Sequence, residues 1–311
     1  MRLKEEIFKV AIELAKRVGA CAIISMVEPP HTLPLSDISG DLPPLIVLER
    51  GRPPPEHIHM GRSVYETLDG EPVEGREVKK LVDTIDAVST SATSVISSAV
   101  DMCILQKLID LKGNYVVGIT YTRSSFAIVL YNVKESTLLR MFEECYERVN
   151  VEVLRSVINL AISMGCEGRE GKRLGTMFVI GDTEEVMKRS HQLVLNPFKG
   201  HPKKHRLITD QQNWETFKGL AQLDGAFVVD EEGVVMAAGR YLDVDVKNVK
   251  LPKGFGGRHV SAAAITRETK AIVVTLSESG GEVRVFKDGA IIYETSPLQM
   301  GVYIPRKGDE R

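Results

Sequence analysis

The chain has 311 residues, which is enough for two domains of ordinary size. With 43% hydrophobic and 26% charged residues, its composition is that of a globular protein and excludes a disordered chain. The net charge of −2 gives no reason to expect a nucleic-acid partner. No apolar run is long enough to span a bilayer, and the first twenty residues form a charged amphipathic pattern rather than a signal peptide. We therefore expect a cytoplasmic protein without a membrane segment.

The N-terminal half predicts a small α/β layer domain. Nine of the fourteen prolines lie at or before Pro72, so the segment 28–72 is expected to be rich in loops, with short strands at 20–25 and 45–49. Strands that alternate with helices follow this segment, and such alternation is typical of α/β layers. The expected elements are a helix at 76–81, a strand at 85–88, a helix at 93–111 and strands at 115–120 and 126–130.

The stretch YNVKES at 131–136 marks the expected domain boundary, which divides the chain into 1–133 and 134–311. Two helices are predicted beyond it, and Gly165 is expected to end the second. Hairpin patterns dominate the rest of the chain. Strands are expected at 176–181, 226–230, 234–239, 271–277, 282–286 and 290–294, with a helix at 211–223. The predicted fold class is α/β, with an N-terminal α/β layer domain and a C-terminal mixed β-sheet flanked by helices.

An acid and a glycine, Asp224 and Gly225, follow the predicted helix 211–223 and precede the strand that starts at Ala226. Gly225 suits the left-handed residue that ends many helices. Asp224 would then lie at the negative pole of the helix dipole, which costs about 0.3–1 kcal/mol at an exposed site. A bound cation would offset this cost, and carboxylate oxygens are ligands that Mg²⁺ and Mn²⁺ prefer. The two interpretations are an ordinary helix end and a metal site.

The stretch GFGGRHV combines glycines with two basic residues at the predicted start of another helix. Gly256 and Gly257 would let backbone N–H groups converge at the helix N-terminus, where anions bind. Arg258 can bind phosphate oxygens through two N–H groups, and His259 can donate a further hydrogen bond. The alternative is a plain glycine turn with a solvated arginine and a packed histidine. Together with Asp224, the basic pair favours a metal–polyphosphate ligand held between the two segments.

Five stretches occur in the order seen in the diadenylate cyclase domain: EGREGKRLGTMFVIGDTEEV, LNPFKGH, LDGAFVVDEEG, GGRHVSAAAIT and AIVVTLSES. The chain resembles this family from roughly Thr137 to Tyr293, about half of its length. The resemblance implies an enzyme that condenses two ATP molecules into cyclic di-AMP and releases two pyrophosphates. The layout with an added N-terminal domain is similar to the archaeal branch, whose N-terminal part is likened to the C-terminal domain of pyruvate kinase.

The resemblance also implies roles for individual residues. Asp224 takes the place of the family's metal-binding aspartate, and Glu278 that of a second ligand for Mn²⁺ or Mg²⁺. Arg258 and His259 take the phosphate contacts, so the expected catalytic residues are these two and Asp224. The remaining substrate-binding positions are Gly225, Ala226, Gly256, Gly257 and Ser277.

Three departures from the family pattern keep a second function open. Gly257 stands where the family usually has threonine or alanine, Val260 stands where many members have arginine or threonine, and Ser279 replaces a second acid. A catalytically weak protein that senses cyclic di-AMP or ATP is therefore an alternative, and an interaction module whose N-terminal half mainly assembles oligomers is another. Asp224 favours catalysis, because binding a finished product requires no metal carboxylate.

The number of substrates predicts self-association. One chain offers a single set of site residues, whereas the implied reaction uses two ATP molecules. We therefore expect catalytic domains that face each other in a dimer or a higher assembly. The segment 1–133 carries no catalytic group of residues, and we expect it to regulate or to oligomerise.

Overall fold

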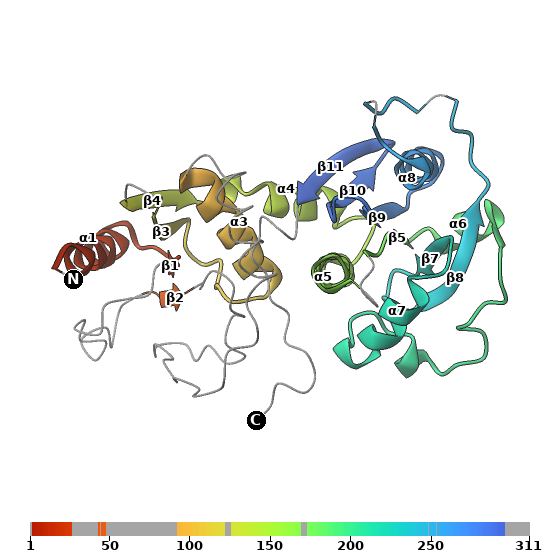
Figure 1. Ribbon diagram of the computed structural model, residues 1–311, viewed down its shortest axis with the longest axis horizontal. Coiled ribbons are helices and arrows are strands. Elements are labelled where there is room, and N and C mark those ends of the chain that lie inside the picture. The colour runs from red at the N-terminus through yellow and green to blue at the C-terminus, as the bar shows by residue number, and fades with distance from the viewer. Residues whose placement is uncertain are drawn as a thin grey trace. The chain divides into compact units, whose positions relative to one another are not determined.

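The computed structural model describes residues 2–26, 43, 45–47, 92–121, 126–168, 173–247, 249–252 and 254–295. The chain forms two compact units, an N-terminal one up to Ser136 and a C-terminal one from Thr137 (Figure 1). The elements predicted at 76–81 and 85–88 lie outside the described residues. In the described part of the chain, no helix has the length and apolar character needed to cross a membrane.

The N-terminal unit is built on a four-stranded sheet with the order β2-β1-β3-β4. The first three strands of this order are parallel, and β4 pairs antiparallel with β3. Two helices pack on the sheet, which confirms the predicted α/β layers. The elements are α1 (Arg2–Val18), β1 (Ala22–Ser25), β2 (Leu45–Val47), α3 (Ala92–Leu105), β3 (Tyr115–Tyr121) and β4 (Phe126–Asn132).

The two helices cover opposite faces of this sheet. The apolar stripe of α1 packs against Val117 and Ile119 of β3. Gly118 lies between these two residues and points to the other face, because successive strand residues alternate sides. A Cβ at Gly118 would be 2.6 Å from the side chain of Ile96, so glycine lets α3 approach the sheet closely.

In two of the helices that end elsewhere than predicted, a residue with a positive φ sets the true end. The helix predicted at 93–111 stops early because Lys107 adopts a φ of 58° and Leu108 donates its N–H back to the last turn. Nothing in the sequence predicts that this lysine adopts a left-handed conformation. The second helix of the C-terminal unit runs through Gly165 and ends where Gly168 adopts a φ of 59°.

The C-terminal unit is built on a seven-stranded sheet with the order β11-β10-β9-β5-β7-β8-β6. Only β5 and β7 are parallel neighbours within it, which confirms the predicted mixed sheet. The strands are β5 (Thr176–Ile180), β6 (Ser190–Gln192), β7 (Ala226–Val229), β8 (Val235–Leu242), β9 (Ile272–Leu276), β10 (Val283–Lys287) and β11 (Ala290–Thr295). The α-helices are α4 (Thr137–Cys145), α5 (Val151–Glu167), α6 (Thr183–Lys188), α7 (Trp214–Leu220) and α8 (Gly257–Glu268).

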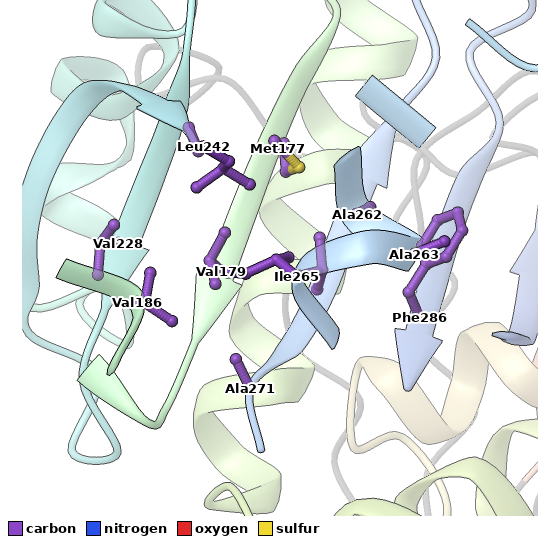
Figure 2. Close-up of a cluster of buried hydrophobic side chains, with 12 residues drawn as sticks. Met177, Val179, Val186, Val228, Leu242, Ala262, Ala263, Ile265, Ala271 and Phe286 are labelled. Carbon is purple, nitrogen blue, oxygen red and sulfur yellow. The ribbon is translucent and has the colours of Figure 1, made fainter. Parts of the chain in front are cut away.

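Helices on both faces bury the central strands β5 and β9 at every position. On one face, Met177 and Val179 of β5 share a core with Ala262, Ala263 and Ile265 of α8 (Figure 2). On the other face, α5 packs against β5, β9 and β10 (Figure 1). The alanines leave little bulk between α8 and the sheet, so this packing fixes the position of the N-terminus of α8.

Candidate active site

Three segments that are far apart in the sequence meet at one edge of the C-terminal sheet, the edge formed by the ends of its central strands. β5 begins beside the last residue of β9 on one side and beside the start of β7 on the other. The residues just outside these strand ends are therefore neighbours. They are Gly175 before β5, Asp224 two residues before β7 and Glu278 two residues after β9.

Arg258 in the first turn of α8 lies between the two acids. Its Nη1 donates a hydrogen bond to Oε2 of Glu278 at 3.2 Å, and its Nη2 lies 3.8 Å from Oδ1 of Asp224. The Asp224 side chain is 93% exposed and that of Glu278 is 64% exposed. Two solvent-accessible carboxylates thus surround one guanidinium group, which leaves a local excess of negative charge.

Gly175 makes this meeting of side chains possible, and the sequence analysis missed it. A Cβ at this position would be 2.7 Å from Cβ of Glu278 and 2.8 Å from Nη1 of Arg258. The one signal that could have found it is a glycine directly before a buried strand. Any larger residue would force Arg258 and Glu278 apart.

The N-terminus of α8 presents backbone donors beside Arg258. Gly256 precedes the helix with a φ of −77° and a ψ of 176°, and no side chain caps the helix end. Its carbonyl accepts the N–H groups of His259 and Val260, so the first turn is formed. The earlier N–H groups, those of Gly257 and Arg258, point out of the helix end. A Cβ at Gly256 or Gly257 would meet no atom within 4 Å, so no described atom crowds these two residues at the helix end, which is a kind of position where anions bind.

The reason predicted for Gly225 is wrong. α7 ends at its cap residue Ala221, which is right-handed, so Gly225 does not close the helix and Asp224 does not lie at its negative pole. Gly225 adopts a φ of +102°, and a Cβ there would be 2.7–2.8 Å from backbone atoms of Gly239 and Arg240. The conformation of Gly225 therefore allows the turn before β7 to lie close to β8. The sequence does not predict this contact between distant segments.

Two further positions from the sequence analysis are buried. Ala226 begins β7 and belongs to the core beneath α8. Ser277 donates its backbone N–H to the carbonyl of Glu282 at 2.9 Å, and its hydroxyl lies 3.2 Å from that of Ser279. Ser277 thus shapes the connection between β9 and β10 that carries Glu278.

His259 lies in the first turn of α8 and is only 8% exposed. Its Nε2 lies 3.2 Å from Nη1 of Arg284, and its ring meets that of Phe255 edge-on at a centroid distance of 5.2 Å. Burial, and after it the charge of Arg284, lower the pKa of His259. The ring is therefore packed, as in the alternative interpretation of the sequence, whereas the adjacent Arg258 faces the carboxylates. Arg284 and Phe255 were not singled out from the sequence.

The sheet edge offers a partial ligand set for a divalent cation. Within the described ranges, no group of three or more His, Cys, Asp or Glu side chains is placed to hold a metal ion. Asp224 and Glu278 nevertheless supply exposed carboxylate oxygens on the two sides of Arg258. Mg²⁺ is commonly held by one or two carboxylates, with water and substrate phosphates at its other positions. The donor set fits a site that is completed by a phosphorylated substrate.

Comparison with known proteins finds that the segment carrying these residues is similar to a family of nucleotide-binding domains. Residues 163–291 match the family model described as DisA bacterial checkpoint controller nucleotide-binding, or DAC. This segment includes every site residue discussed above, and it is similar to the DAC domain that the family model describes.

Two curated archaeal relatives carry the name diadenylate cyclase. One from Methanocaldococcus jannaschii is 48% identical over 174 residues, which are 55% of this chain and 55% of that protein. One from Haloferax volcanii is 41% identical over 150 residues, which are 48% of this chain and 55% of that protein. The chain thus spans about half the length of the curated relatives it matches. A solved structure of a DacA double mutant from Staphylococcus aureus matches 48% of this chain and 90% of that chain at 21% identity, with a TM-score of 0.35.

Proposed function

We propose that the protein is a diadenylate cyclase, which condenses two ATP molecules into cyclic di-AMP and two pyrophosphates. The observation that carries this proposal is the meeting of Asp224, Arg258 and Glu278 beside the open N-terminus of α8. Anion-binding and cation-binding groups lie within a few ångströms of each other there, as a metal–triphosphate ligand requires. We further propose that the protein acts in the cytoplasm, where ATP is available.

The proposed reaction forms one phosphodiester bond at each of two ATP molecules. The 3′-oxygen of one ATP bonds to the α-phosphorus of the other, while the bond from that phosphorus to the β-phosphate oxygen breaks. Pyrophosphate leaves with the electron pair of this bond, and the 3′-hydroxyl proton passes to the carboxylate of Asp224. A second transfer in the opposite direction closes the ring.

The roles of the residues follow from their charges. Asp224 and Glu278 would hold Mn²⁺ or Mg²⁺, which when bound neutralises triphosphate charge and polarises the reacting groups. Arg258 would exchange its carboxylate partners for phosphate oxygens, since guanidinium binds both kinds of group with two N–H donors. The N–H groups of Gly257 and Arg258 would stabilise the departing pyrophosphate with the positive end of the helix dipole.

The proposal is tested by incubating the purified full-length chain with ATP and either Mn²⁺ or Mg²⁺ and separating the products by chromatography. Cyclic di-AMP is the expected product. If no divalent metal supports product formation while ATP or cyclic di-AMP still binds in calorimetry, the chain is a nucleotide sensor. Val260 is the observation that favours this second function, because it supplies no polar contact to a ligand in the first turn of α8.

Turnover is expected to require two copies of the C-terminal unit, because one copy provides one set of Asp224, Arg258 and Glu278. The specific activity should therefore fall as the protein is diluted, in parallel with the loss of dimer or higher assembly seen by light scattering. A species that is strictly monomeric by light scattering and retains full turnover would contradict the face-to-face arrangement. We propose that residues 1–133 regulate the enzyme or assist this assembly.

A further inference from the structure

The contact between His259 and Arg284 determines which ring nitrogen of the histidine carries a proton. Nη1 of Arg284 lies 3.2 Å from Nε2 of His259. A guanidinium group can only donate hydrogen bonds, so Nε2 must accept this one with its lone pair. The ring is then neutral, with its proton on Nδ1. In the described part of the chain, this buried Nδ1 has no hydrogen-bond partner.

Arg284 is held firmly enough to impose this state. It lies on β10 with only 12% of its side chain exposed, and its Nε donates to Oε2 of Glu294 at 2.5 Å. Its guanidinium group stacks over the ring of Phe255 at 5.0 Å from the centroid. Phe255 in turn contacts His259 edge-on, so the arginine, the phenylalanine and the histidine form one packed cluster.

We propose that Arg284 is a positioning residue that keeps His259 neutral with its proton on Nδ1, so that this N–H can donate to a phosphate oxygen of the bound nucleotide. The inference rests on the proposed function for the identity of the acceptor. A buried N–H without a partner is costly, and an incoming phosphate oxygen would satisfy it. Because Nδ1 is closed to solvent in the structure, the groups that cover it would have to move when the nucleotide binds.

This assignment also explains two basic residues at the positive end of a helix. Of these two helix residues, Arg258 carries the charge, and it is balanced by Asp224 and Glu278. A neutral His259 adds a donor without adding a second positive charge next to the helix dipole. The nucleotide would then be bound by one charged and one neutral side chain.

The charges around His259 favour the neutral ring. Arg284 and Arg258 lower its pKa, whereas Glu282 and Glu294 raise it, and burial is the largest cause of the net lowering. Removing the positive charge of Arg284 should therefore raise the pKa of His259. As the pH falls, the His259 ring would then become protonated at a higher pH than in the wild type.

The test is Arg284→Met, which keeps most of the bulk but cannot donate a hydrogen bond. Nitrogen-15 NMR of the histidine rings in the full-length protein would identify the tautomer, with His259→Gln used to assign one of the seven histidine signals. Wild type is expected to show a proton on Nδ1, and Arg284→Met a mixture with the Nε2 form and a raised pKa. The dissociation constant for ATP should rise roughly tenfold in Arg284→Met, as expected for one lost hydrogen bond to a charged acceptor.

Two further variants separate positioning from general packing. Arg284→Lys retains a charged donor and should restore part of both the tautomer and the affinity. Arg155→Met is the matched control, because Arg155 also stacks on a phenylalanine, Phe142, but lies on α5. It should leave the His259 signal unchanged.

A proton on Nε2 in the wild type, or an unchanged tautomer in both Arg284 variants, would overturn the inference. The ring signal does not depend on turnover, so a protein without cyclase activity but with the expected tautomer would contradict the proposed function alone.

Discussion

Replacing Asp224 by asparagine is expected to lower the rate of cyclic di-AMP formation by about 10²–10³-fold, the usual effect of removing a group that stabilises transition-state charge. Asparagine has nearly the same shape but cannot neutralise a divalent cation or accept the 3′-hydroxyl proton. The stability of the protein should not change, because the side chain is 93% exposed and its contact with Arg258 at 3.8 Å is a surface ion pair. Rates and thermal unfolding measured on the same samples check both expectations.

Glu232→Gln is the matched control for this variant. Glu232 is also an exposed acid in an ion pair, with Lys203, and lies in the turn between β7 and β8. It should retain wild-type turnover. Turnover of Asp224→Asn above a tenth of the wild-type rate would remove Asp224 from the proposed metal site, and a large loss of stability would show that its role is structural.

Replacing Gly225 by alanine is expected to destabilise the C-terminal unit by about 1–3 kcal/mol, the usual cost of a side chain in a disfavoured backbone conformation. The φ of +102° is one that other residues rarely adopt. The new Cβ would also lie 2.7–2.8 Å from the backbone of Gly239 and Arg240, so the turn would have to move away from β8. Because that turn carries Asp224, turnover should fall together with the midpoint of urea-induced unfolding.

Gly256→Ala is the matched control for the stability measurement. Gly256 has a φ of −77°, which any residue adopts, and a Cβ there would meet no atom within 4 Å. Its unfolding midpoint should stay close to that of the wild type. Equal midpoints for Gly225→Ala and the wild type would show that the turn can relax without cost, and the close approach to β8 would then not matter for the fold.

The local parts of the fold could be predicted from the sequence because they depend on neighbouring residues. The Asp-Gly turn between β10 and β11 is an example, since Asp288 and Gly289 both adopt positive φ angles of 51° and 82°. The order of the strands could not be predicted, because it depends on pairings between distant segments. The position of β5 between β9 and β7 is such a pairing, and it is what brings Gly175, Asp224 and Glu278 together.

The same distinction between local patterns and distant pairings applies to the residues of the candidate site. Arg258 could be singled out because a positive charge at the positive end of a helix dipole predicts a bound anion. Asp224 was singled out through a helix end that the structure places at Ala221 instead. Gly225 was chosen as a helix end, whereas the structure shows that its conformation allows a close approach to β8. Arg284 was missed because it is an ordinary polar residue in an alternating strand, and its contact with His259 depends on the packing of β10 against α8.

The most direct test of the proposed reaction compares ATP with its deoxy analogues, using the full-length chain and Mn²⁺ and counting pyrophosphate against cyclic product. ATP should give two pyrophosphates for each cyclic di-AMP, and 2′-deoxy-ATP should still react, because the 3′-hydroxyl is the proposed attacking group. 3′-Deoxy-ATP should bind and give neither product. Pyrophosphate release from 3′-deoxy-ATP, or a cyclic product from it, would contradict attack by the 3′-hydroxyl at the site formed by Asp224, Arg258 and Glu278.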